Sequence, residues 1–157
     1  MRIQFPVTMA VVASAIVQVV WAGAPATART WSMSAMTSDR AASMAFDAMR
    51  KGHRLPPWAP RHGTEPPASI VSFQGHDVYV MHACKPHDCS AEQLAVMYDP
   101  SKRVMYGVLS VSGSKAGTEQ LTWLNIGGGP ESIDGRTILY AALTGSLDNH
   151  PGAFNYK

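Results

Sequence analysis

The stretch "VYVMHACKPHDCSAEQLAVMYD", residues 78–99, decides the fold, because it contains two strand-like runs separated by a segment with a cysteine at each end. Residues 78–83 are rich in β-branched and aromatic side chains, and residues 91–99 are predominantly apolar. Runs of this length and composition are typical of β-strands. The stretch therefore predicts two antiparallel strands joined through a loop that runs from Cys84 to Cys89.

Three further strands are predicted on either side of this pair. Residues 68–73 ("ASIVSF") precede a turn expected at 75–77, and residues 103–112 ("RVMYGVLSVS") follow a type I turn expected at 99–102, with Pro100 in its second position. Residues 119–126 ("EQLTWLNI") form the fifth candidate, which ends at the three glycines 127–129. The pattern predicts a sheet of five antiparallel strands.

Helices are predicted before and after the strands. In "DRAASMAFDAMRKG", residues 39–52, apolar side chains recur at helical spacing, and Ser38 is expected to cap the helix. A second helix is expected within residues 132–147. Residues 53–67 contain five prolines and predict an irregular connection, pinned to the core by Leu55 and Trp58. The fold class is therefore α+β, with a central five-stranded antiparallel sheet flanked by helices in α/β/α layers and a protruding cysteine loop.

The N-terminus predicts export from the cytoplasm. Arg2 is followed by an apolar run over residues 7–21, too short for a bilayer anchor, and then by the small residues Ala26-Thr27-Ala28. We interpret residues 1–28 as a cleavable secretory signal peptide and residues 29–157 as a single domain. The predicted localisation is the periplasm, with no membrane anchor.

Charge and composition exclude several classes of partner. Without Arg2 the chain has 12 basic and 11 acidic residues, and these are dispersed along the sequence. Neither nucleic acid nor an anionic membrane is an expected partner, because both recognise concentrated positive charge. No sequence motif indicates a cofactor.

Export also predicts the redox state of the two cysteines. Disulfides persist in oxidising compartments, so Cys84 and Cys89 are expected to be joined. A ring of this size would stabilise the fold by about 2 kcal/mol in the chain-entropy model. Its larger effect would be local, because the disulfide and Pro86 together restrict Lys85, His87 and Asp88 and so lower the entropy cost of binding.

Other interpretations of the loop remain open from the residues alone. A zinc site needs more ligands than two thiolates and His87, and a redox site favours two residues between the cysteines rather than four. A cysteine nucleophile needs a free thiol. From the residues alone, a structural staple with solvated charges is the favoured interpretation. The remaining histidines are assigned to surface or packing roles. Trp58, Trp123 and Tyr140 are assigned to the core or to an interface rather than to recognition.

Several motifs in order resemble the Ivy family, inhibitors of vertebrate (c-type) lysozyme. They are "GHRLPPW" (52–58), "CKPHDC" (84–89), "LTWLN" (121–125), "SIDGRT" (132–137), "AALTGSL" (141–147) and "NHPGAFNYK" (149–157). The resemblance implies a non-enzymatic protein with a five-stranded antiparallel sheet, whose disulfide-closed loop enters the lysozyme cleft. It implies that His87 approaches the two catalytic carboxylates. The roles of its neighbours stay open: Lys85 either adds attraction to the acidic cleft or solvates the tip, and Asp88 either orients His87 and the loop backbone, which is the favoured role, or accepts from an enzyme arginine. Pro86 restricts the backbone of the tip.

The resemblance leaves some points as expectations. Control of the cell's own lytic transglycosylases is an alternative function, and a periplasmic metal or redox module is a weaker one. A homodimer is compatible with the family, but no feature of the sequence specifies it. Ser90 stands where family members often have glycine, so the loop would leave the sheet at a different angle if that position needed a positive φ.

Overall fold

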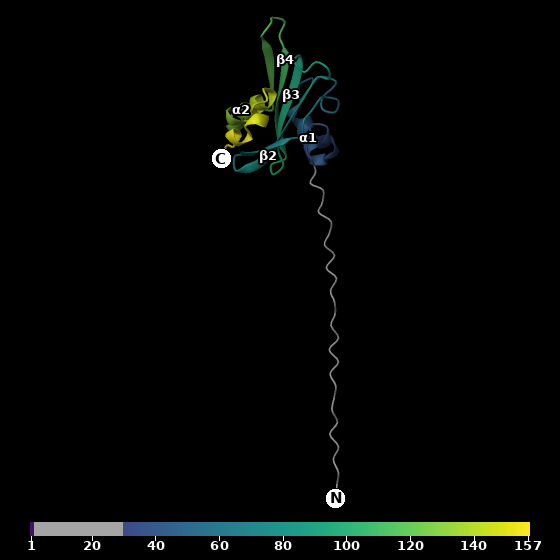
Figure 1. The fold of residues 1–157 in the computed structure, drawn as a ribbon, viewed down its shortest axis with the longest axis vertical. Coiled ribbons are helices and arrows are strands. Elements are labelled where there is room, and N and C mark those ends of the chain that lie inside the picture. Colours follow the sequence, from purple (N-terminus) through teal and green to yellow (C-terminus); the bar gives the residue numbers. More distant parts are fainter. Residues whose placement is uncertain (2–29) are drawn as a thin grey trace.

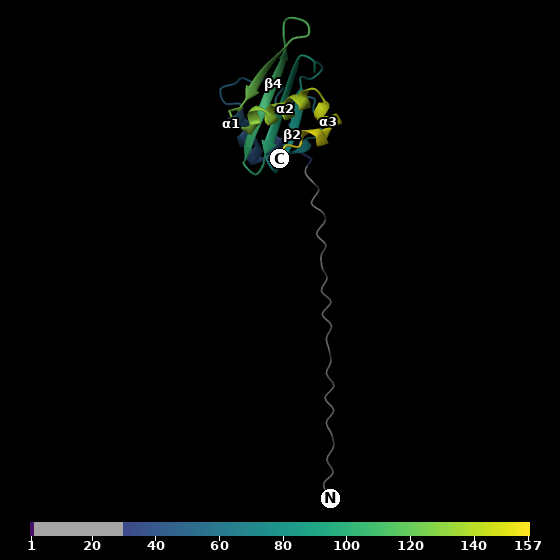
Figure 2. The same cartoon turned by 90° about the vertical axis from the view of Figure 1, so that its left-hand side faces the viewer.

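The computed structural model describes residue 1 and residues 30–157. The predicted signal peptide, residues 1–28, lies outside the described residues apart from Met1. The described part is a five-stranded sheet with helices on both faces, as Figure 1 shows from one side and Figure 2 after a quarter turn. The predicted α+β class, the antiparallel sheet and the joined cysteines are confirmed.

The strands follow one another across the sheet in chain order, and every neighbouring pair is antiparallel. Their bounds are β1 (Ser69–Phe73), β2 (His76–Cys84), β3 (Glu92–Asp99), β4 (Val104–Ser112) and β5 (Glu119–Leu124). In the central strand β3, Leu94, Val96 and Tyr98 belong to the core on one face, while Ala95 and Met97 belong to the core on the other. This alternation follows from the two-residue period of a strand, and it explains why β3 is apolar almost throughout.

Helix α1 (Arg40–Met49) covers one face of the sheet, and helices α2 (Asp134–Leu143) and α3 (Ser146–Asn149) cover the other (Figure 1). Short 3-10 helices lie at η1 (Ala35–Ser38), η2 (Pro130–Ser132) and η3 (Pro151–Phe154). None of the helices within residues 30–157 is long and apolar enough to cross a membrane.

The helix ends differ from the sequence prediction. Ser38 closes η1, and the cap of α1 is Asp39, whose carboxylate accepts a hydrogen bond from the Ala42 amide at 2.9 Å. Asp39 has extended backbone angles, which are required of an N-cap, whereas Ser38 is already helical. The predicted second helix is interrupted at Gly145, whose φ of 74° is in the left-handed region that ends a helix.

Two strand ends also differ from the prediction. The first turn occupies Gln74 and Gly75, both with positive φ, so His76 and Asp77 belong to β2 rather than to the turn. β5 ends at Leu124, because Asn125 adopts a φ of 54° and its side-chain amide donates to the Met105 carbonyl at 2.8 Å. A residue with left-handed backbone angles cannot continue a strand.

The proline-rich connection is irregular, as predicted, and is held against the core by Trp58 and the half-buried Leu55. Of the other aromatic residues assigned to packing, Trp123 is half-buried with the Arg136 guanidinium 5.0 Å from its ring centre, and Tyr140 is exposed and donates to Glu119. The edge of β1 is covered by residues 155–156, because the Tyr156 amide donates to the Ser72 carbonyl at 2.7 Å.

Candidate functional site

The cysteine loop occupies residues 85–91, between the ends of β2 and β3. Cys84 and Cys89 are joined by a disulfide, and their Cα atoms are 4.8 Å apart. The Lys85 amide donates to the Glu92 carbonyl at 3.0 Å, which continues the strand pairing by one step into the loop. The loop therefore begins as a direct extension of the two central strands, so a rigid sheet sets its direction.

The tip of the loop is a β-turn over residues 85–88, closed by a 3.1 Å hydrogen bond from the Asp88 amide to the Lys85 carbonyl. Pro86 occupies its second position, and His87, with a φ of 64°, its third. Since proline cannot take a positive φ and a type I turn has a negative φ at its third position, this is a type II turn. His87 is an exposed residue of this turn.

The left-handed residue of the loop is therefore His87. Ser90 is not among the described residues with positive φ, so its position does not require glycine. Ser90 instead contributes hydrogen bonds: its hydroxyl donates to Asp88 at 3.3 Å, and its carbonyl accepts from the Ser112 hydroxyl. The loop is thus fastened on this side to the end of β4.

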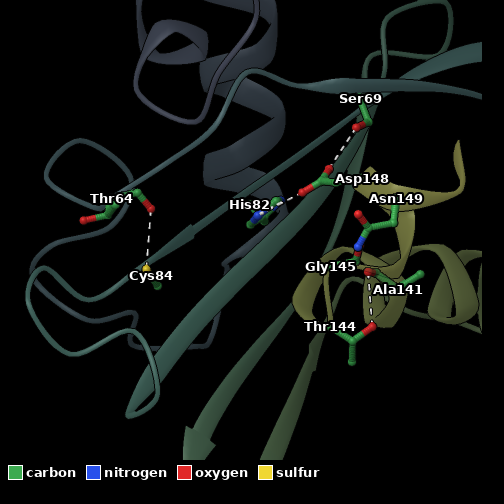
Figure 3. Close-up of polar contacts among 9 residues, drawn as sticks. All are labelled: Thr64, Ser69, His82, Cys84, Ala141, Thr144, Gly145, Asp148 and Asn149. Carbon is green, nitrogen blue, oxygen red and sulfur yellow. Dashed lines mark hydrogen bonds and ion pairs between the residues drawn. The ribbon is translucent and has the colours of Figure 1, made fainter.

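The opposite side of the loop is fastened to the proline-rich connection. Thr64 and Cys84 exchange both backbone hydrogen bonds, each at 3.0 Å. Figure 3 shows Thr64 beside Cys84, with the Thr64 carbonyl oxygen 3.7 Å from the Cys84 sulfur. A disulfide sulfur carries no proton, so this is a packing contact rather than a hydrogen bond.

Glu92 lies under the loop and links it to Trp58. One carboxylate oxygen of Glu92 accepts from the Trp58 indole N–H at 2.8 Å, and the other lies 4.0 Å from the Lys85 ammonium. The Lys85 ammonium is also 3.6 Å from the Asp88 carboxylate. Lys85 and Asp88 thus neutralise each other within the loop.

Sequence reasoning missed Glu92 and treated Trp58 only as a core aromatic. The available signal was the "GHRLPPW" motif, whose tryptophan lies 34 positions before Glu92 and contacts it only in the folded chain. Within residues 30–157, no hydrogen bond or ion pair engages the His87 ring. His87 is therefore an exposed side chain of the tip whose ring has no polar partner within residues 30–157.

His82, on β2 two residues before Cys84, is the half-buried histidine nearest to the loop in sequence. Figure 3 shows its ring directed toward Asp148 of α3; its Nε2 atom is 3.7 Å from one Asp148 oxygen, while the Ser69 hydroxyl donates to the other at 3.2 Å. Burial lowers the pKa of His82 below its usual 6.5, and the Asp148 charge opposes that shift. His82 belongs to the packing between β2 and α3.

The disulfide determines the chemistry of the two cysteines. The disulfide leaves no thiolate to bind a metal or attack a substrate. Among residues 30–157, no three His, Cys, Asp or Glu side chains are grouped closely enough to hold a metal ion. The loop is held by the disulfide and by backbone hydrogen bonds, and His87 is exposed on it.

Comparison with known proteins gives consistent matches. Residues 41–144 match the family model described as "Inhibitor of vertebrate lysozyme (Ivy)". Proteins named inhibitor of vertebrate lysozyme from Escherichia coli strains K12 and O157:H7 are each 44% identical over 125 residues, 80% of this chain and 79% of theirs. A protein of that name from Pseudomonas aeruginosa is 33% identical over 65 residues, 40% of this chain and 42% of its own. The family match spans the sheet, the cysteine loop and α2, and on these findings the chain belongs to the Ivy family, a family of inhibitors rather than enzymes.

Proposed function

We propose that this protein inhibits c-type lysozyme by inserting the Cys84–Cys89 loop into the active-site cleft of the enzyme. The observation that carries the proposal is that His87 is exposed in a type II turn within the disulfide-closed loop. Relatives with the same family assignment are named for this activity. The proposed site of action is the periplasm, which follows from the signal peptide predicted over residues 1–28.

The chemistry of the target suits an imidazole. A retaining glycosidase has its two catalytic carboxyl groups about 5 Å apart on either side of the bond that it cleaves. A charged imidazole donates from both of its nitrogens and can engage two acceptors at once. His87 placed between the carboxylates would occupy both catalytic groups while the loop backbone blocks the sugar-binding groove.

The rigidity of the loop supports tight binding. The disulfide, the two Thr64 hydrogen bonds and the Ser112 contacts hold the loop in one conformation before any partner arrives. A preorganised loop loses little conformational entropy on binding, so more of the contact energy appears as affinity. Lys85 and Asp88 shape the tip through their mutual ion pair, and Pro86 fixes the turn.

The direct test is a lysozyme lysis assay with the purified, oxidised protein. Wild type should inhibit at near-equimolar ratio, and His87→Ala should weaken inhibition by at least about thirtyfold, as expected of an interface hot spot. His87→Gly serves as the matched variant, because glycine accepts the positive φ of this position without strain and removes only the ring.

The two variants separate side-chain chemistry from backbone shape. Equal losses in His87→Ala and His87→Gly indicate that the imidazole makes the contact, whereas retained inhibition in His87→Gly would disprove its role. A wild-type protein that leaves lysozyme fully active would overturn the function. Running a lytic transglycosylase in parallel tests that enzyme as the alternative target.

A further inference from the structure

Positive charge is concentrated in one part of the chain, although the total is nearly balanced. Residues 40–64 contain five basic side chains, Arg40, Arg50, Lys51, Arg54 and Arg61, with Asp47 as their one carboxylate. Residues 65–157 contain six basic and nine acidic side chains. The segment from α1 to Thr64 thus carries a net positive charge, and the acidic residues Asp39 and Glu65 flank it directly.

Three of these arginines line one cavity. It has a volume of about 410 Å³ and lies between α1 and the proline-rich connection. Its apolar lining includes Met36, Phe46 and Leu55, and its charged lining is Arg50, Arg54, Arg61 and Asp47. A cavity of this size accommodates a ligand with a compact body and a charged group.

The cavity is lined by three arginines but by only one carboxylate, that of Asp47. Arg50 is held by Asp47, with Nε and Nη2 at 2.8 and 2.7 Å from the same carboxylate oxygen. Arg50 is also the C-cap of α1, where it offsets the negative end of the helix dipole. Arg54 and Arg61 are exposed, and within residues 30–157 no hydrogen bond or ion pair engages either guanidinium.

The two arginines are held on a stiff segment. Arg54 and Arg61 flank Pro56, Pro57 and Pro60, and between them the buried Trp58 anchors the chain. Proline restricts the backbone, and guanidinium groups are planar forks that match the oxygens of carboxylates and phosphates. Arg54 and Arg61 can therefore both donate hydrogen bonds to a negative group that enters this cavity.

We propose that this cavity is a second binding site, separate from the inhibitory loop, for a ligand that carries an oxyanion. Arg54 and Arg61 bind the phosphate or carboxylate group, and Phe46 and Leu55 contact the body of the ligand. Arg50 stays paired with Asp47 and adds a further donor at the rim. The site is independent of lysozyme inhibition, because none of its lining residues belongs to the cysteine loop.

The test measures binding of pyrophosphate and of citrate by NMR titration of the isotope-labelled protein. We expect saturable shifts confined to the amides of residues 36–61, and at least about tenfold weaker binding by the Arg54→Gln/Arg61→Gln double variant. That loss corresponds to the removal of charge-assisted hydrogen bonds worth about 1.4 kcal/mol or more. A parallel arm uses vesicles of phosphatidylglycerol in phosphatidylcholine, which distinguishes a lipid headgroup from a free anion.

The matched control is Lys115→Gln/Lys157→Gln, which removes the same charge far from the cavity in sequence and leaves the cavity lining intact. Its binding should stay within about twofold of wild type, since distant surface charges are screened at physiological salt. Equal weakening in both double variants would show diffuse attraction and overturn the proposal, as would absence of binding to all three probes. Thermal unfolding and the lysis assay of the Arg54→Gln/Arg61→Gln variant should match wild type, which confirms that it is folded.

Discussion

At the scale of single residues, Glu92 joins the base of the cysteine loop to the proline-rich connection. Glu92 is only partly exposed. One of its carboxylate oxygens accepts a hydrogen bond from the Trp58 indole, and the other lies near the Lys85 ammonium. The indole hydrogen bond is the shorter and better shielded of the two contacts. The ion pair lies near the surface, where such pairs contribute little. Glu92 should therefore act mainly through Trp58.

We predict that Glu92→Ala lowers the free energy of unfolding by about 1–3 kcal/mol, because it leaves the Trp58 indole N–H without its acceptor. Glu92→Gln keeps an oxygen for the indole and loses only the charge, so it should cost less than about 1 kcal/mol. Urea unfolding measures both values. Equal losses in the two variants would show that the charge, rather than the indole hydrogen bond, is the stabilising part.

At the scale of elements, the strand that carries the loop is braced from the helical layer. Asp148 of α3 contacts both Ser69 of β1 and His82 of β2 (Figure 3). Gly145 makes this possible, because its left-handed backbone redirects the chain between α2 and α3. The "AALTGSL" motif thus has a structural role in this protein: it places a carboxylate against the two first strands.

The pKa of His82 predicts how stability depends on pH. Burial lowers the folded-state pKa below 6.5, so between that lowered pKa and 6.5 the unfolded chain binds more protons than the folded one. The His82 contribution to stability is therefore complete above pH 6.5 and is lost as the pH falls toward the folded-state pKa. His82→Gln should remove this dependence.

The measurement is urea unfolding from pH 5 to pH 8 in wild type and His82→Gln, compared as a difference so that other groups cancel. Asp148→Asn is the informative companion, because it removes the charge that opposes the shift. In Asp148→Asn the folded-state pKa of His82 should be lower still, so the loss of stability should continue to a lower pH than in wild type. A difference curve that is flat across the range would refute the assignment.

At the scale of the whole molecule, two cores share one sheet and meet at its central strands. Met49 of α1 packs directly over Gly107 of β4, where an added Cβ atom would lie 2.8 Å from the Met49 sulfur and 3.1 Å from the Ala95 carbonyl oxygen. The helix can approach the sheet this closely because position 107 has no side chain.

Gly107→Ala should therefore lower the free energy of unfolding by about 1–3 kcal/mol, as overpacking does in well-filled cores. Gly128→Ala is the control, since an added Cβ there meets nothing within 4 Å. Thermal or urea unfolding distinguishes the two. Combining Gly107→Ala with Met49→Ala should give less than the sum of the single effects, because the two residues share one contact.

The sequence by itself determined the strands, the α+β class and the pairing of Cys84 with Cys89. These follow from short-range properties, namely the two-residue period of buried side chains, proline and glycine in turns, and an oxidising compartment inferred from the N-terminus. The tip residues Lys85, Pro86, His87 and Asp88 could be singled out for the same reason, since they lie between two cysteines that are close in the chain.

Tertiary structure alone decided the rest. The positive φ of His87, the choice of Asp39 over Ser38 as a cap and the early turn at Gln74 depend on small differences in local energy that packing settles. The Trp58–Glu92 bond, the His82–Asp148 contact and the convergence of Arg50, Arg54 and Arg61 on one cavity join side chains whose distance depends on how the layers pack. Sequence patterns specify which residues are buried and which lie in turns. The contacts between distant segments form only when the sheet and both helical layers pack together.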